Sequence, residues 1–173
     1  QFNDGINFLK NDKYCGLIVQ KMKPPFFPQE RGYFKSLIKY IIYQQLSIKA
    51  ARKIYDRLVF LFKEDKINPT NFKKLSKNRL KEIGISNSKI NYMNEIADSF
   101  NNNNNFLTNI DSLSNQEIID ILIKIKGVGP WTADMFLMFT LNRLDVFPIN
   151  DLGIKKGMQK LFKLDAIPHD KFI

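Results

Sequence analysis

Residues 125–133 read IKGVGPWTA, and this stretch differs most clearly from a generic helical sequence. Gly127 and Gly129 stand two apart, which permits a backbone turn too tight for larger side chains. Pro130 suits the first position of a new helix. Backbone N–H groups at such a turn can point together at an anion, and Lys126 adds a positive charge beside them. The stretch predicts a phosphate-binding helix–hairpin–helix, although a bare Gly-x-Gly also occurs in ordinary turns.

Helices are expected on both sides of this hairpin. Ser114 and Glu117 match a capping box ahead of apolar residues at helical spacing, which predicts a helix from about Ser114 to Ile125. A second helix is expected over Pro130–Leu141, because apolar residues continue there without a break. The hairpin motif therefore covers about residues 114–141.

The rest of the chain also has a helical pattern. Apolar residues recur at spacings of three and four, and no segment alternates with a period of two. The asparagine run at 101–105 is expected to be a solvated loop. Further helices are expected over residues 34–42, after Ser47, after Ser86 or Asn87, and from near Asn150. The pattern predicts an all-α fold.

Composition narrows the class of protein. The 173 residues, 44% of them hydrophobic, suit a single domain over 1–173. The formal charge of +10 favours a polyanionic partner, either nucleic acid or an anionic membrane surface. The apolar stretches are too short to cross a bilayer, no signal peptide opens the chain, and no basic helix has a large aromatic face. We therefore expect an intracellular protein that does not bind membranes.

The cysteine count and the chain ends add two expectations. The single cysteine, Cys15, excludes an internal disulfide framework and suits a reducing compartment. The chain begins with Gln1 and stops at Ile173 in mid-pattern, so both ends are expected to be trimmed.

Three ordered motifs resemble the helix-hairpin-helix (HhH-GPD) superfamily of DNA glycosylases, in particular its AlkA-type 3-methyladenine DNA glycosylase II members. GVGPWTA at 127–133, followed by DVFPINDLG at 145–153, is similar to the core of these enzymes. QQLSIKAA at 44–51 resembles their DNA-contacting joint, and residues 80–89 fit their middle segment. The similarity runs from about residue 30 to 163. It implies a compact helical glycosylase domain of two helical lobes, from which the family's C-terminal helices are missing.

The resemblance assigns catalysis to Asp151. Cleaving an N-glycosidic bond builds positive charge on the sugar, which a fixed carboxylate stabilises. The alternative is that Asp151 only caps a helix, since Asp is favoured at that position. Bifunctional members of the superfamily carry a lysine where this chain has Trp131, so lyase chemistry is not expected. The resemblance instead places Trp131, and one turn later Met135, in the base pocket, where aromatic rings attract cationic bases.

The resemblance also implies the DNA contacts. Gln45 or Leu46 would fill the gap left by a flipped nucleotide. Tyr43 and Asn150 depart from the family pattern, so a shift of the local geometry is expected at these two positions. The residues expected to bind DNA are Gln45, Leu46, Ser47, Lys49, Lys126, Gly127, Gly129 and Thr132. No cofactor is expected, apart from a Na⁺ or K⁺ ion on the backbone carbonyls of Ile123, Ile125 and Val128.

Together these residues imply a monofunctional base-excision repair enzyme. It would act as a monomer on double-stranded DNA with a damaged base, in a DNA-containing compartment, the nucleus if the source is eukaryotic. Its substrates would be alkylated purines such as 3-methyladenine. Two alternatives stay open: a non-catalytic helix-hairpin-helix DNA-binding module, and a glycosylase for another lesion.

Overall fold

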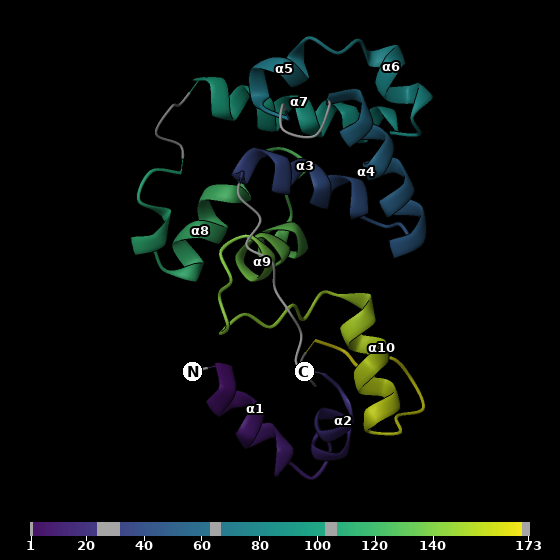
Figure 1. Ribbon diagram of the computed structural model, residues 1–173, viewed down its shortest axis with the longest axis vertical. Helices are drawn as coiled ribbons and strands as arrows, with labels where there is room; N and C mark the ends of the chain where they lie inside the picture. The colour runs from purple at the N-terminus through teal and green to yellow at the C-terminus, as the bar shows by residue number, and fades with distance from the viewer. Residues whose placement is uncertain (1, 24–31, 63–66, 103–106, 171–173) are drawn as a thin grey trace.

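The computed structural model describes residues 2–23, 32–62, 67–102 and 107–170. Over these ranges the chain forms ten α-helices and one short 3-10 helix, and no strand (Figure 1). The all-α prediction is confirmed. None of the helices in these ranges has the length and apolar character that crossing a membrane requires.

Helix α3 (Tyr33–Tyr43) is the centre of the larger lobe. It packs against α4 (Ile48–Phe62), α7 (Asn87–Asn102) and α9 (Pro130–Phe139). Its apolar residues recur every three or four positions, so they form one buried face. That face is completely shielded from solvent at Leu37, Ile38 and Ile41.

Shorter helices surround this centre. Helices α5 (Pro69–Lys73) and α6 (Lys77–Glu82) pack on α7, and α8 (Asn115–Leu122) packs on α9. The 3-10 helix η1 (Ile110–Ser112) precedes α8. The predicted capping box is present: the Ser114 hydroxyl accepts from the Glu117 amide, and the Glu117 carboxylate accepts from the Ser114 amide.

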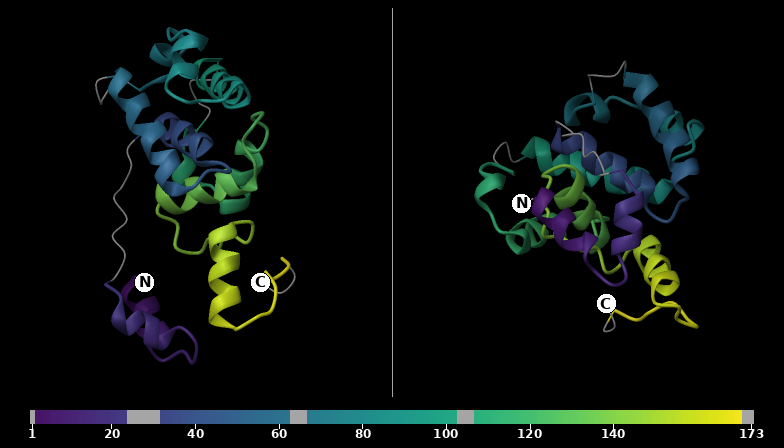
Figure 2. Two further views of the ribbon diagram at one scale, coloured as in Figure 1. Left: turned by 90° about the vertical axis from the view of Figure 1, so that its right-hand side faces the viewer. Right: turned by 60° about the horizontal axis from the view of Figure 1, so that its bottom comes forward.

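The second lobe consists of α1 (Phe2–Lys10), α2 (Gly16–Lys21) and α10 (Leu152–Leu161). These helices gather away from the rest of the molecule in two perpendicular views (Figures 1 and 2). The Tyr14 and Phe162 rings join them, with centroids 4.8 Å apart. The two expected lobes are therefore present.

Three predicted boundaries are wrong. The helix that begins after Ser114 ends at Leu122 rather than Ile125, because the Ile125 amide reaches back only to the Leu122 carbonyl and so tightens the last turn. Helix α9 ends at Phe139, two residues before the predicted end. Asn101 and Asn102 belong to α7 instead of a loop, and residues 103–105 of the asparagine run lie outside the described ranges.

Candidate functional site

A cleft of about 1330 Å³ opens where three segments meet. The first is the joint between α3 and α4, residues 43–48. The second is the glycine hairpin with the first turn of α9, residues 127–132. The third is the start of α10, residues 150–153, and side chains of α7 complete the wall. Segments more than a hundred residues apart in sequence thus form one concave surface, as ligand sites commonly do.

The two glycines of the hairpin differ in what the fold requires of them. Gly127 has φ +94°, which favours glycine, and a Cβ built there would lie 2.1 Å from the Tyr92 ring. Gly129 has φ −102°, and a Cβ there would have no neighbour within 4 Å. The fold therefore needs glycine at 127. At 129 it does not, and the missing side chain leaves the backbone of α9's first turn open on the cleft side.

Two polar side chains hold the α3–α4 joint. The Gln44 amide nitrogen donates to the Gly127 carbonyl at 2.9 Å and to Thr132 Oγ1 at 2.8 Å. The Lys89 ammonium donates to the carbonyls of Ile42 and Gln44, each at 2.8 Å, and so caps the end of α3. Burial lowers the pKa of Lys89. Gln45, which follows Gln44, has φ +55° and is exposed in the cleft.

The Asp151 carboxylate is held at both oxygens. Oδ1 accepts from the Ile154 amide at 3.0 Å and thereby caps α10. Oδ2 accepts from Trp131 Nε1 at 2.7 Å. Asp151 therefore does cap the helix, as the alternative interpretation held, but it uses one oxygen only. The second oxygen links α10 to the first turn of α9, directly behind the hairpin.

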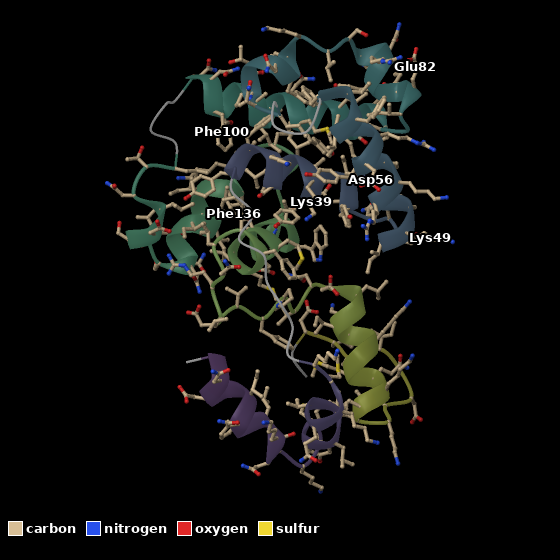
Figure 3. All side chains as sticks on the ribbon, viewed as in Figure 1. Lys39, Lys49, Asp56, Glu82, Phe100 and Phe136 are labelled. Carbon is tan, nitrogen blue, oxygen red and sulfur yellow. The ribbon has the colours of Figure 1, made fainter. Side chains whose placement is uncertain are left out.

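The cleft brings together most of the residues singled out from the sequence. Lys49 and Lys126 are exposed but lie outside its lining, and Lys49 projects from the first turn of α4 (Figure 3). Met135 is buried in the hydrophobic core and is not part of the lining. Thr132 is buried, and its hydroxyl is engaged by Gln44. The predicted residues that line the cleft are Gln45, Leu46, Ser47, Gly127, Val128, Gly129, Trp131, Thr132 and Asp151.

The backbone carbonyls of Ile123, Ile125 and Val128, which are predicted to hold a monovalent cation, are oxygen ligands of the kind that Na⁺ and K⁺ bind. The Ile125 carbonyl accepts from the Val128 amide at 3.0 Å, and within the described ranges no donor is found for the carbonyls of Ile123 or Val128. Bound there, Na⁺ or K⁺ would add positive charge beside the hairpin. The described residues contain no cluster of His, Cys, Asp or Glu that could hold a metal ion.

Sequence reasoning missed the roles of four residues of this site. Gln44 ties the α3–α4 joint to the hairpin, Lys89 caps α3, and Tyr92 supports the hairpin. Gly153 leaves room for the Asp151 carboxylate. Lys89 and Tyr92 lie within an ordinary amphipathic helix pattern, which contains no signal for either role. Gln44 could have been suspected, because a glutamine that follows a fully apolar helix face needs partners for its amide.

Comparison with known proteins shows which family has this sequence and fold. Residues 38–173 match the HhH-GPD superfamily of base excision DNA repair proteins. DNA-3-methyladenine glycosylase 1 of Schizosaccharomyces pombe is 30% identical over 166 residues, which is 95% of this chain and 73% of that protein. The DNA-3-methyladenine glycosylase of Saccharomyces cerevisiae is 33% identical over 163 residues, which is 88% of this chain and 53% of that protein. The chain thus spans about half to three quarters of these two relatives.

A solved structure agrees with this relationship. The 3-methyladenine DNA glycosylase of Schizosaccharomyces pombe in complex with abasic DNA matches with a TM-score of 0.90 at 29% identity, over 98% of this chain and 85% of that one. The helix-hairpin-helix arrangement expected from the sequence is confirmed.

Proposed function

The chain belongs to the HhH-GPD superfamily of base excision DNA repair proteins, and from this premise we propose that it is a monofunctional glycosylase for alkylated purines such as 3-methyladenine. The observation that carries the proposal is the position of Asp151. Its carboxylate lines the same cleft as the hairpin and is held through both oxygens. Two relatives that bear the name DNA-3-methyladenine glycosylase support the substrate class.

DNA is held by the larger lobe in this proposal. The open backbone at Gly129 and the positive end of the α9 dipole attract a phosphate, and the nearby charge of Lys126 adds to the attraction. Gln45 or Leu46, both exposed in the cleft, fills the space that a flipped nucleotide leaves in the duplex. Lys49 gives further charge from the start of α4.

The glycosidic bond is then cleaved beside Asp151. As the bond between base and deoxyribose breaks, positive charge builds on the sugar, and the fixed carboxylate stabilises it. The carboxylate can also orient the water that attacks the sugar. A purine alkylated on a ring nitrogen is already cationic and leaves without a strong general acid. A non-catalytic DNA-binding module could cap α10 with a neutral side chain such as asparagine, and the negative charge of this carboxylate would only repel DNA phosphates.

Trp131 explains why the activity is limited to hydrolysis. The indole cannot form a Schiff base with the sugar, so no strand cleavage follows base release. Its ring lies half-buried in the cleft, where a cationic base can stack on it. The product is an abasic site in double-stranded DNA. The enzyme works as a monomer in a DNA-containing compartment, which is the nucleus if the source is eukaryotic.

Single-turnover base release from methylated duplex DNA tests the proposal. Asp151→Asn keeps a good helix cap but removes the charge, so release should slow about 10²-fold or more while binding to abasic-site DNA is retained. Asp145→Asn is the matched control, since Asp145 is exposed and does not line the cleft. Binding of DNA by the parent protein without any release would instead point to a binding module or to another lesion.

A further inference from the structure

Gly153 has no conformational reason to be glycine. It lies in the first turn of α10 and is exposed to solvent. The glycines with positive φ in the described ranges are Gly32, Gly84 and Gly127, so Gly153 has a backbone that other residues adopt. Alanine is favoured over glycine in helices. The fold by itself would therefore prefer alanine at 153.

Space, rather than backbone conformation, explains this glycine. A Cβ at Gly153 would lie 2.9 Å from Asp151 Oδ1, and beyond its chain neighbours and the backbone of its own helix it would meet no other atom within 4 Å. The missing side chain makes room for the Asp151 carboxylate alone. That carboxylate is the end of a short side chain, so a methyl group at 153 would displace the carboxylate rather than the backbone.

The carboxylate cannot rotate without losing its partners. Oδ1 is the oxygen that accepts from Ile154, and Oδ2 accepts from Trp131. Hydrogen bonds weaken steeply with misalignment, so rotation that relieves the clash at Oδ1 disturbs both bonds. A methyl group at 153 would thus move the charged group that faces the sugar while leaving the helix intact.

We infer that Gly153 is a positioning residue for catalysis, whose missing side chain keeps the Asp151 carboxylate fixed between the α10 amide and the Trp131 indole. The inference deepens the proposed function and rests on it. Misplacing a reacting group by about 1 Å can slow a reaction about 10²-fold.

Gly153→Ala tests this role, with Gly157→Ala as its matched control. Gly157 lies in the same helix, and a Cβ there would have no neighbour within 4 Å. We expect Gly153→Ala to slow single-turnover release from methylated duplex DNA about 10²-fold. Its affinity for abasic-site DNA should match that of Gly157→Ala, and its melting temperature should lie only slightly lower, because the weakened cap of α10 is the main loss to the fold. Gly157→Ala should release base at the parent rate.

Fluorescence gives a second readout that does not depend on activity. Trp131 is the single tryptophan of the chain, so its emission reports the contact with Asp151. Gly153→Ala and Asp151→Asn should both alter the emission, and Gly157→Ala should leave it unchanged. The inference is overturned if Gly153→Ala releases base at the parent rate and keeps the parent emission. It is also overturned if Gly153→Ala and Gly157→Ala slow release equally. If the parent protein releases no base, the proposed function is refuted. The Trp131 emission alone then tests whether Gly153 positions the Asp151 carboxylate.

Discussion

Helices α9 and α10 both begin at the cleft, but they are held there in different ways. Helix α9 buries five residues in the larger lobe, and its first turn is tied to α3 through Gln44. Helix α10 has no buried residue. The side that we propose binds DNA is therefore positioned by the core, whereas the side that carries Asp151 is positioned by a few hydrogen bonds and the contact between the Tyr14 and Phe162 rings. Substitutions on the first side should cost stability, and those on the second should cost rate.

The largest expected effect is that of Gly127→Ala on the α9 side. The new Cβ would overlap the Tyr92 ring, and φ +94° is strained for alanine, so unfolding should become easier by about 3 kcal/mol. Urea denaturation measures the change. Gly129→Ala is the matched control and should lose much less stability, because its Cβ would have no neighbour within 4 Å beyond the adjoining residues and only the weaker preference for alanine at an N-cap counts against it. Its binding to abasic-site DNA should weaken, because the added methyl group covers part of the open backbone. Equal stability losses in both variants would remove the distinction between the two glycines.

An intermediate effect is expected for Lys89→Met. This change removes both donors that cap α3, and hydrogen bonds from a charged group contribute about 2 kcal/mol to the free energy of unfolding. The control is Lys81→Met, because Lys81 is an exposed lysine of the neighbouring helix α6 and does not line the cleft. Thermal or urea denaturation compares the two. Indistinguishable stabilities would mean that core packing alone holds the joint.

The smallest effect is expected from Trp131→Phe, a substitution in the first turn of α9 that removes a contact to the α10 side. Phenylalanine keeps an aromatic face in the cleft but cannot donate to Asp151 Oδ2. Losing a hydrogen bond to a charged group costs about 1.5 kcal/mol, so base release should slow about tenfold. The single-turnover rate measures this, and a melting curve checks that the fold is intact. A parental rate would show that the helix cap alone positions Asp151, and the contrast between the two helices would then be weaker.

Local patterns were enough to predict the helices and the hairpin. The buried face of α3, the capping box at Ser114 and the turn at Gly127 follow from the spacing of apolar residues and from backbone preference, which act over a few residues. The resemblance to the glycosylase family added the prediction that Asp151 is the catalytic carboxylate. The helix ends at Leu122 and Phe139 were predicted wrongly, because the apolar pattern continues past the point where the backbone hydrogen bonds change.

The helical fold, the basic charge and a glycine hairpin followed by an aspartate are all evident from the amino-acid sequence. Which side chains hold that aspartate and that hairpin depends on the packing of the helices. Gln44 meets Gly127 across 83 positions, Lys89 meets Ile42 across 47, and Trp131 meets Asp151 across 20. Such contacts depend on how whole helices pack and on the rotamers that packing leaves open, and neither is encoded in any short stretch of the chain.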